Sequence, residues 1–369
     1  MKNIKKILRK TFKLFFYKVF ILVYGKIKGK IFYNEDSRIE THVIKDFENF
    51  KYNVFRIKKS RLYTDRIHDT AIIIDNLIVD GPSQQLRPIN NDIVENNIVF
   101  QKGTPRIKKN LHGNVLSLLT GGGGNDNYWH WLFDVLPRLA LCEKVVNIDD
   151  VNFFLLPSLD KKYQIETLES LKIPEEKWLS SKRYRHIESD EIIVTDHPYV
   201  VSNDSTKDIQ NIPVWISKWL RKKFLKEKIS NINLPKKIYI DREDAPSKKK
   251  FRSIINEKEV KNLFNENGFT SIILSNYTFA TQVELFNNAE IIAGLHGAAF
   301  ANMCFSKPGS KVIELNSLTA GKMIENVALI NGLIHKTLSS KPEKFDVKNQ
   351  QGHIKVSLDL LNKLIKELS

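Results

Sequence analysis

The sequence predicts an α/β protein of two Rossmann-like domains, with a doubly wound parallel sheet in the C-terminal half. Predicted strands and helices alternate strictly between residues 237 and 338, with short connections, as in a parallel sheet covered by helices. A buried strand at 290–295 ends in a glycine-rich turn that leads into a helix. The chain has 369 residues, 42% hydrophobic and 27% charged, which suits two globular domains.

We divide the chain into four segments. They are a basic amphipathic segment at 1–35, an N-terminal α/β domain at 36–231, a C-terminal Rossmann-like domain at 232–340, and a C-terminal connection and helix at 341–369. The boundary near 232 follows a long basic amphipathic segment at 204–229, and the residues from Asn231 to Pro235 form the linker.

The N-terminal segment carries most of the positive charge. Residues 1–30 hold ten Lys or Arg and no Asp or Glu, in a chain of net charge +16. The longest uncharged run there, residues 19–25, is far shorter than the roughly 20 residues of a spanning helix, and no convincing signal-peptide cleavage site follows. A basic amphipathic helix on the cytoplasmic membrane face and a helix packed on its own domain both fit.

In the N-terminal domain, mixed patterns predict both element types. Strands are expected at 71–75, 114–119, 152–156 and 191–194, and helices at 127–146 and 161–172. Four consecutive glycines at 121–124 predict a hinge or a loop whose backbone approaches a ligand. The only cysteines, Cys142 and Cys304, allow no disulfide framework or zinc spacing, and a reducing compartment fits them.

The C-terminal domain has the clearer pattern. Strands are expected at 237–240, 270–274, 290–295, 311–315 and 334–338, and helices at 256–267, 278–288, 298–305 and 320–331. The first of these helices has an Asn-x-x-Glu cap, Asn256 and Glu259. A polar connection at 342–352 and an amphipathic helix at 354–368 end the chain.

One candidate site lies on the helix at 127–146. His130, Asp134 and Arg138 are spaced by four residues, which places them on one helix face. An imidazole one turn from a carboxylate forms an ion pair or a polarised base, and Pro137 is expected to kink the helix. A structural network is the alternative, and a metal pair is disfavoured because no third ligand has convincing spacing.

A second candidate site follows the strand at 290–295. Gly294 and Gly297 allow close approach of a ligand to the backbone, and the helix after them presents free amides that favour a phosphate. Glu314 lies near the end of the next strand. The alternative is a tight turn in an α/β core, with His296 as a packed core histidine.

Arginines follow the strand at 237–240. Arg242 directly follows that strand and Arg252 lies ten residues further on, and the planar fork of arginine suits a diphosphate. Arg242 should meet the glycine-rich turn in one crevice at the strand ends. Lys248, Lys249 and Lys250 fit a solvated loop.

Together these motifs resemble glycosyltransferase family 61, especially its bacterial capsular polysaccharide branch. The likeness covers roughly residues 110–320. It is carried by Trp129-His130-Trp131-Leu132-Phe133-Asp134-Val135-Leu136-Pro137-Arg138, by Ile240-Asp241-Arg242 with Arg252, Asn256 and Glu257, and by Gly294-Leu295-His296-Gly297-Ala298-Ala299-Phe300-Ala301-Asn302 with Val312-Ile313-Glu314-Leu315. Asp241 departs from the family pattern, in which a Ser or Thr commonly precedes the arginine, and a carboxylate there is able to pair with Arg242.

The resemblance implies a GT-B architecture with two domains facing a central cleft. It also implies an inverting enzyme that transfers a hexosyl or pentosyl group from a nucleotide sugar, such as a UDP-sugar, to a glycan or lipid-linked glycan. The donor residues it implies are Arg242, Arg252, Asn256, Glu257, His296, Gly297, Ala298, Ala299, Asn302 and Glu314, the last binding the ribose hydroxyls. On the acceptor or cleft side it implies Asn127, Trp129 and Arg138, with Asp134 and His130 as catalytic residues.

Inverting transfer needs a base for the acceptor hydroxyl and positive charge for the leaving diphosphate. A base in such single displacements is often a carboxylate, which favours Asp134, with His130 as the alternative. No Asp-x-Asp follows a predicted strand, so we expect a metal-independent enzyme without a cofactor, peripheral at the inner face of the cytoplasmic membrane.

Two rival functions remain at this point. A polysaccharide pyruvyl transferase also uses paired α/β domains, but it would bind phosphoenolpyruvate instead of a nucleotide sugar. A non-enzymatic protein that binds nucleic acid or an acidic polymer is disfavoured, because the charge concentrates in residues 1–30 and not on a folded face with interleaved aromatics. No specific nucleic-acid partner is expected.

Overall fold

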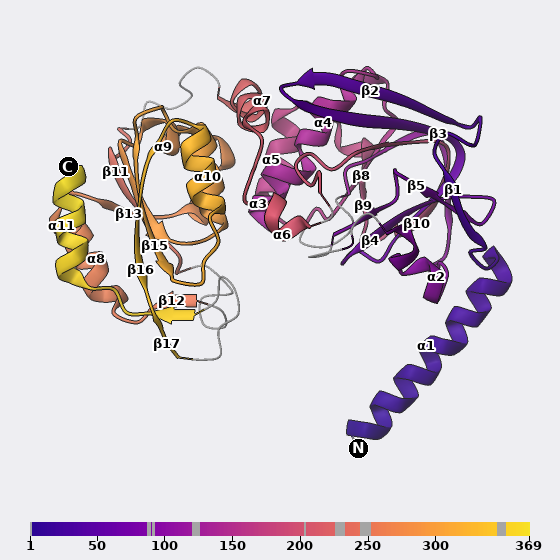
Figure 1. The fold of residues 1–369 in the computed structure, drawn as a ribbon, viewed down its shortest axis with the longest axis horizontal. Helices are drawn as coiled ribbons and strands as arrows, with labels where there is room; N and C mark the ends of the chain where they lie inside the picture. Colours follow the sequence, from indigo (N-terminus) through magenta and orange to yellow (C-terminus); the bar gives the residue numbers. More distant parts are fainter. Residues whose placement is uncertain are drawn as a thin grey trace. The chain divides into compact units, whose positions relative to one another are not determined.

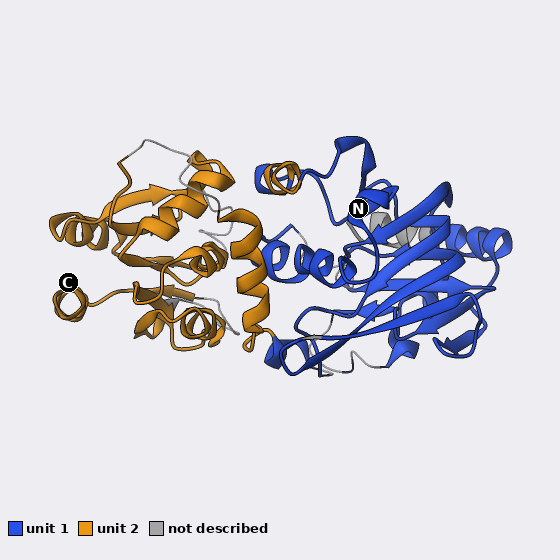
Figure 2. Ribbon diagram, turned by 90° about the horizontal axis from the view of Figure 1, so that it is seen from above, with its two compact units in different colours: residues 1–164, 172–208 blue, residues 165–171, 209–369 orange. Residues whose placement is uncertain are grey.

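The computed structural model describes residues 2–86, 90, 93–119, 126–202, 204–225, 233–243, 252–344 and 352–369. The chain forms two compact units (Figure 2): the N-terminal unit is Met1–Gln164 with Lys172–Asp208, and the C-terminal unit is Ile165–Leu171 with Ile209–Ser369. The chain passes between the units at Asp208, earlier than the boundary predicted near 232. That boundary lies outside the described residues, as do the four glycines at 121–124 and the lysines at 248–250.

The N-terminal unit is built on a ten-stranded mixed sheet among its described residues, in the order β1-β5-β4-β3-β10-β7-β8-β9, with β2 paired to β3 and β6 to β4. The strands are β1 (Gly29–Phe32), β2 (Ile39–Phe47), β3 (Phe50–Thr64), β4 (Asp69–Ile74), β5 (Leu77–Asp80), β6 (Gln84–Gln85), β7 (Lys109–Ser117), β8 (Phe153–Leu156), β9 (Trp178–Ser180) and β10 (His186–Thr195). The helices are α1 (Lys2–Tyr24), α2 (Val99–Lys102), α3 (Tyr128–His130), the π turn η2 (Trp131–Val135), α4 (Pro137–Cys142), α5 (Lys162–Ser170), which runs into the C-terminal unit, and α6 (Ser205–Asp208), with short 3₁₀ turns at Val94–Asn96, Ile148–Asp150 and Glu175–Lys177.

This sheet has a parallel half and a mainly antiparallel half, at whose edge β1 pairs parallel with β5. Strands β10, β7, β8 and β9 are parallel neighbours, and helical segments connect β7 to β8 and β8 to β9, as parallel pairs require. Strands β2 to β5 instead pair antiparallel in sequence order. Asp75 and Asn76 join β4 to β5 with φ of 48° and 66°, the left-handed backbone of a two-residue hairpin turn. The prediction of mixed α/β structure is confirmed, but the Rossmann-like pattern is limited to the parallel half.

The C-terminal unit contains a five-stranded sheet in the order β13-β11-β14-β15-β16, and every pair in it is parallel. Its strands are β11 (Lys237–Asp241), β13 (Thr270–Ile273), β14 (Ile291–Leu295), β15 (Lys311–Ser317) and β16 (Ile334–Ser340). A small second sheet joins β12 (Arg252–Ile254), β18 (Gly352–Ile354) and β17 (Pro342–Lys344). The helices are α7 (Val214–Phe224), α8 (Glu257–Glu266), α9 (Phe279–Asn288), the 3₁₀ helix η6 (Ala298–Phe305), α10 (Met323–Ile330) and α11 (Leu358–Leu368), with a 3₁₀ turn at Leu274–Asn276.

Helices cover both faces of this parallel sheet. α8 and α11 lie on one face, and α9 and α10 lie on the other (Figure 1). Phe264 of α8 and Leu361 of α11 pack in one core cluster with Tyr239 and Ile313 of the strands. The prediction of a doubly wound parallel sheet is therefore confirmed for this unit, because its alternating β and α segments bury one apolar stripe of each helix against the sheet.

The order in which strands are added to this sheet reverses at β11. From β11 the chain adds β13 on one side and then crosses to β14 on the other. Ligands of open α/β sheets bind outside the carboxyl ends of the strands at such a reversal. The carboxyl ends of β11 and β14 are therefore the expected ligand position in this unit.

The helix α1 is long, but Lys18 interrupts its apolar run. Within the described part of the chain, no helix is both long enough and apolar enough to span a membrane.

Candidate active site

The first group of predicted residues lies at the start of a helix in the N-terminal unit. Asn127 caps α3, and its side chain accepts the Trp129 amide hydrogen at 2.9 Å. Trp129 is 4% exposed and packs edge-on against Phe133, with ring centroids 4.7 Å apart. Both residues therefore fix the position of the neighbouring His130.

Pro137 gives this helix a wide turn. Proline has no amide hydrogen to continue the α pattern, and the chain closes a π turn, in which the Leu136 amide bonds the Trp131 carbonyl at 3.1 Å. The sequence predicted one shared face for His130, Asp134 and Arg138. His130 and Asp134 are in contact, whereas the guanidinium of Arg138 makes its hydrogen bonds to Thr195 and Gln84.

Asp134 lies between two imidazoles. Its Oδ2 is 2.5 Å from Nδ1 of His130 and 3.6 Å from Nε2 of His197. The Asp134 side chain is fully buried, whereas those of His130 and His197 are 18% and 10% exposed. A hydroxyl group of a substrate can therefore reach an imidazole in this cluster more readily than the carboxylate.

The two histidines use their ring nitrogens differently. Nδ1 of His197 accepts the amide hydrogens of Tyr199 at 3.3 Å and Val200 at 3.0 Å, so its proton is on Nε2, which faces Asp134. His130 instead contacts Asp134 through Nδ1, so in the neutral ring Nδ1 carries the proton and Nε2 keeps its lone pair. His130 is therefore the imidazole with a basic nitrogen left for a substrate.

Burial and charge act in opposite directions on these groups. Burial lowers the pKa of His130, but the charge and the hydrogen bond of Asp134 outweigh it, and the net pKa is raised. Burial raises the pKa of Asp134, but the contacts with His130 and His197 outweigh it, and the net pKa is lowered. For His197 burial dominates, and its pKa is lowered. The cluster thus holds an ionised carboxylate and a neutral His197 at neutral pH.

Arg138 is fully buried. Its Nη1 donates to the carbonyl of Thr195 at 2.9 Å and to Oγ1 at 3.1 Å, and its Nη2 donates to Oε1 of Gln84 at 2.9 Å. Burial lowers the pKa of Arg138 to about 10, which leaves it charged at neutral pH. Arg138 therefore holds Gln84 and the end of β10 in place, and its own guanidinium has no exposed surface for a ligand.

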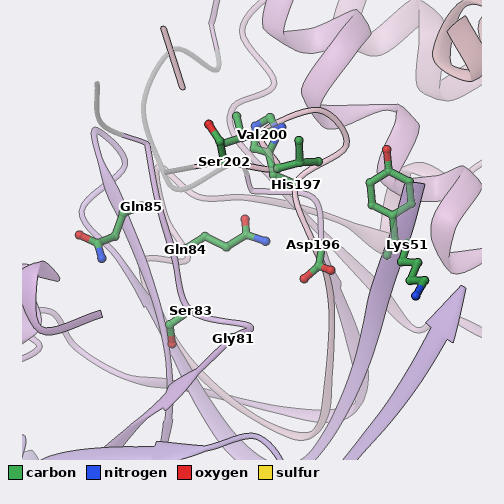
Figure 3. Close-up of a pocket in the computed structure, with 11 residues that line it drawn as sticks. Lys51, Gly81, Ser83, Gln84, Gln85, Asp196, His197, Val200 and Ser202 are labelled. Carbon is green, nitrogen blue, oxygen red and sulfur yellow. The ribbon is translucent and has the colours of Figure 1, made fainter. Parts of the chain in front are cut away.

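A pocket of about 640 Å³ lies beside this cluster in the N-terminal unit. Its polar side chains come from three segments, residues 51–52, 83–85 and 196–202 (Figure 3). The lining residues are Lys51, Tyr52, Gly81, Ser83, Gln84, Gln85, Asp196, His197, Val200, Val201 and Ser202. Burial raises the pKa of Asp196 to about 6, although its Oδ2 accepts the amide hydrogen of Asn53 at 2.7 Å. Carboxylate, amide and hydroxyl groups of this kind can hydrogen-bond the hydroxyls of a sugar.

The second group of predicted residues meets at the reversal point of the C-terminal sheet. Arg242 follows β11 and Gly297 follows β14, and Nη1 of Arg242 donates to the carbonyl of His296 at 3.0 Å. A Cβ atom at Gly297 would lie only 3.2 Å from that Nη1. Asp241, which the sequence allowed as a partner of Arg242, places its Oδ2 2.5 Å from Nζ of Lys261.

Glu314 forms the centre of a buried network. Its Oε1 is 2.5 Å from Nδ1 of His296 and accepts Nδ2 of Asn316 at 3.1 Å, and its Oε2 is 2.8 Å from Nε2 of His335. Ser339 donates to Oδ1 of Asn316 at 2.6 Å. Burial raises the pKa of Glu314, but the hydrogen bonds from the two histidines outweigh it, and the pKa is held at about 2.

This network changes the expected role of Glu314. The residue is 2% exposed and already accepts three hydrogen bonds, so its carboxylate orients His296 and is poorly placed for ribose hydroxyls. Because Nδ1 of His296 is engaged with Glu314, Nε2 is the ring nitrogen left for a ligand, and it has no hydrogen-bond partner among the described residues.

Arg252 carries buried polar atoms without a partner. Its Nε and Nη1 are buried and have no hydrogen-bond partner in the described part of the chain. Burial and the charge of Arg242 lower its pKa to about 10, against the opposite effect of Glu314. Two guanidinium groups that repel each other at the strand ends form a site that an anion stabilises.

Of the remaining predicted donor residues, Ala298 and Ala299 are half-buried and Asn302 is buried. In η6 the first bond of the helix runs from the Phe300 amide to the Gly297 carbonyl at 3.1 Å, which leaves the amides of Ala298 and Ala299 outside the helical pattern. Asn302 is fully buried and donates to Gln282.

The predicted cap of α8 is wrong. The side chain of Asn256 makes no cap hydrogen bond. Instead its Nδ2 donates to the Val356 carbonyl at 2.9 Å, and its Oδ1 accepts the Val356 amide at 3.0 Å. Asn256 therefore joins α8 to the C-terminal segment, and the next residue, Glu257, is half-buried at the start of the helix.

Sequence reasoning missed His197, Asp196 and His335. A usable signal existed for the first two, because they follow β10 directly and the carboxyl end of a parallel strand is a frequent ligand position. His335 lies inside β16, where a lone histidine gives no such signal. Among the residues that the structure describes, no cluster of three His, Cys, Asp or Glu side chains has the arrangement of a metal site.

The comparison with protein families gives one match. The family model described as Glycosyltransferase 61 matches residues 128–313, about half of the 369-residue chain. The matched range starts just before His130 and ends just before Glu314, so it contains Arg242, Arg252 and the Gly-Leu-His-Gly turn. None of the curated proteins that were compared matches the chain.

Proposed function

The chain belongs to glycosyltransferase family 61, and we propose that it is an inverting enzyme that transfers a hexosyl or pentosyl group from a UDP-sugar to a glycan or lipid-linked glycan acceptor. In this proposal the product enters a capsular or other surface polysaccharide. The two units act as the halves of a GT-B enzyme, with the donor on the C-terminal unit and the acceptor on the N-terminal unit.

The donor diphosphate binds at the carboxyl ends of β11 and β14. Arg242 and Arg252 supply positive charge there, and the unpartnered guanidinium atoms of Arg252 support this role. The amides of Ala298 and Ala299 and Nε2 of His296 complete the anion site. Because these groups offset the charge of the leaving nucleoside diphosphate, we propose that transfer needs no metal ion and no cofactor.

His130 acts as the general base, and Asp134 orients it. This assignment depends on one observation: Asp134 is fully buried and contacts Nδ1 of His130 at 2.5 Å. The acceptor hydroxyl gives its proton to Nε2 of His130, its oxygen forms a bond to the anomeric carbon, and the bond from that carbon to the diphosphate oxygen breaks. Attack from the face opposite the leaving group inverts the anomeric configuration.

The pocket in Figure 3 is our proposed acceptor site. Gln84 and Asp196 hydrogen-bond the acceptor sugar, and Arg138 acts indirectly by fixing Gln84. Asn127 and Trp129 act by holding the helix start that carries His130. The buried position of Arg138 supports this indirect role.

Thermal-shift measurements against nucleotides, nucleotide sugars and phosphoenolpyruvate test the donor assignment. A ligand that binds only the folded state raises the melting temperature by mass action. We expect UDP and one or more UDP-sugars to stabilise the protein equally with and without a chelator. Stabilisation by phosphoenolpyruvate alone would favour pyruvyl transfer instead.

The pH dependence of turnover tests the base. His130 must be neutral to accept a proton, so kcat/KM should rise with pH through its raised pKa and then level off. His130→Gln should lose this rise together with most of the activity. A pH profile that His130→Gln leaves unchanged would exclude His130 as the base.

We also propose that the protein works at the inner face of the cytoplasmic membrane, where residues 1–30 contact anionic lipid. The exposed aromatic side chains of α1 and the ten basic residues of this segment support that location.

A further inference from the structure

A groove of about 830 Å³ lies between α1 and the body of the N-terminal unit. We call it the basic groove. Its apolar side is formed by Phe12, Phe16, Tyr17 and Phe20 of α1, with Ile67 and Ile107 of the body, and its charged side by Lys102, Arg106, Lys109, Lys182, Arg183 and Arg185. Asp65 is the one carboxylate among the described lining residues.

The last turn of α1 attaches the helix to the body. The hydroxyl of Tyr24 accepts the amide hydrogen of Lys108 at 3.0 Å, and its ring lies edge-on to His186 with centroids 4.9 Å apart. Gly103 packs against Ile21, since a Cβ atom there would lie 3.0 Å from it. The contacts place the middle of α1 beside the basic residues of the body.

Earlier turns of α1 expose aromatic side chains next to the groove. Phe12 is 63% exposed and Phe16 is 38% exposed, and on the body Ile107 is 76% exposed. Large apolar side chains gathered around a charged groove are unusual on a surface that faces only water. They fit a surface that enters the boundary between lipid headgroups and acyl chains.

Three arginines of the groove have no ion-pair partner among the described residues: Arg106, Arg183 and Arg185. The Oδ1 of Asp65 accepts the amide hydrogens of Ile67 at 2.7 Å and His68 at 2.8 Å, and its one negative charge faces six cations in the groove. The groove therefore holds a net positive charge within reach of an anion.

The crowding of charge is evident at Arg185. Burial lowers its pKa, and the charges of Arg106 and Arg66 lower it further, against the smaller opposite effects of Tyr63 and Asp65. A phosphate between these groups would relieve the repulsion and accept hydrogen bonds from their planar forks.

We propose that the basic groove binds the phosphate of an anionic phospholipid headgroup, while Phe12 and Phe16 enter the lipid interface beside it. This inference rests on the proposed membrane location and adds a defined headgroup site on the folded body. It does not depend on the sugar-transfer reaction.

Co-sedimentation of the full chain with lipid vesicles tests the proposal. The vesicles contain phosphatidylcholine alone or phosphatidylcholine mixed with phosphatidylglycerol. The wild-type protein should bind the mixed vesicles at least about tenfold more tightly than vesicles of phosphatidylcholine alone. The triple variant Arg106→Gln, Arg183→Gln, Arg185→Gln should lose that preference, because each basic residue at an anionic surface contributes roughly fivefold in affinity. Circular dichroism checks that the variant is folded.

A matched variant controls for net charge. Lys258, Lys363 and Lys366 are exposed on α8 and α11 of the C-terminal unit, and their replacement by glutamine removes the same charge. This control should bind the mixed vesicles as tightly as the wild type. Phe12→Ser with Phe16→Ser should weaken binding without touching the arginines.

Two results would overturn the proposal, and they differ in meaning. If the arginine variant and the lysine variant bind equally well, the membrane contact is made without the basic groove, and the proposed location stands. If the wild-type protein binds neither kind of vesicle, the proposed location fails as well. Neither result bears on whether the protein transfers sugar.

Discussion

A methyl group added at Gly297 tests whether Arg242 helps to bind the donor. The φ of Gly297 is 171°, an extended conformation that alanine also adopts, so Gly297→Ala brings no backbone strain. Its Cβ would lie 3.2 Å from Nη1 and 3.4 Å from Cζ of Arg242. The guanidinium must therefore move by a few tenths of an ångström, away from its 3.0 Å bond to the His296 carbonyl.

The size of the effect follows from the hydrogen bond that the Arg242 guanidinium is proposed to donate to the donor diphosphate. A hydrogen bond with a charged donor contributes about 1.5–3 kcal/mol, and a displaced guanidinium retains part of it. We therefore expect Gly297→Ala to weaken UDP binding by about 1.4 kcal/mol, or roughly tenfold. The free energy of unfolding should change by less than about 1 kcal/mol, because the half-buried Arg242 can shift.

Isothermal titration with UDP measures the affinity, and urea denaturation measures the stability. Gly321→Ala is the matched control, since its Cβ would meet Gln210 at an ordinary 3.6 Å, and it should change neither quantity. If Gly297→Ala acts through Arg242, it should add little to the effect of Arg242→Gln in the double variant. Wild-type UDP affinity in Gly297→Ala, or fully additive effects, would refute the reasoning.

Two further predictions concern buried carboxylates. The folded state holds the pKa of Glu314 at about 2. The ionised carboxylate therefore stabilises the fold at pH values above the ordinary glutamate pKa, and this stabilisation is lost as pH falls toward the pKa of the folded state. Glu314→Gln should lower the free energy of unfolding by about 3 kcal/mol at neutral pH. Urea denaturation should show the difference between the wild type and the variant shrinking toward pH 2. The opposite holds for Asp196, whose pKa is raised to about 6 by burial, so that stability falls as pH rises from the ordinary carboxyl pKa toward that value. Asp196→Asn should therefore stabilise the protein by about 3 kcal/mol at neutral pH and by almost nothing near pH 4; a gain that does not vary with pH would contradict the argument.

The C-terminal unit could be predicted well because its signals are local. Each strand and helix from Lys237 to Ser340 shows its own periodicity, and short connections between parallel strands determine which strand ends meet. For that reason the convergence of Arg242 with the Gly-Leu-His-Gly turn followed from the order of β11 and β14. The register, in which Ile240 pairs with Gly294, agrees with it.

The antiparallel half of the N-terminal unit was harder to predict. In β3 the charged residues Lys58, Lys59 and Arg61 interrupt the apolar alternation, so no period of two is visible there. The Asp75-Asn76 turn was a usable hairpin signal that the sequence reasoning did not include. Its left-handed backbone is typical of such a pair.

The predicted active-site residues were placed by spacing, and spacing assumes a regular helix. Pro137 breaks that assumption through the π turn, and the guanidinium of Arg138 makes its hydrogen bonds to Thr195 and Gln84. The contacts of Asp134 with His197 and of Glu314 with His335 join residues from different elements. Such contacts depend on tertiary packing, which one sequence does not reveal.

The central claim is a division of labour: Arg242 holds the donor diphosphate, and Asp134 acts only through the base that it orients. The most direct test measures UDP affinity and kcat together in Asp134→Asn and in Arg242→Gln. We predict that Asp134→Asn lowers kcat by about 10²- to 10⁴-fold and leaves UDP affinity within a few-fold, while Arg242→Gln weakens UDP binding. Retained turnover in Asp134→Asn together with lost UDP binding would contradict the account.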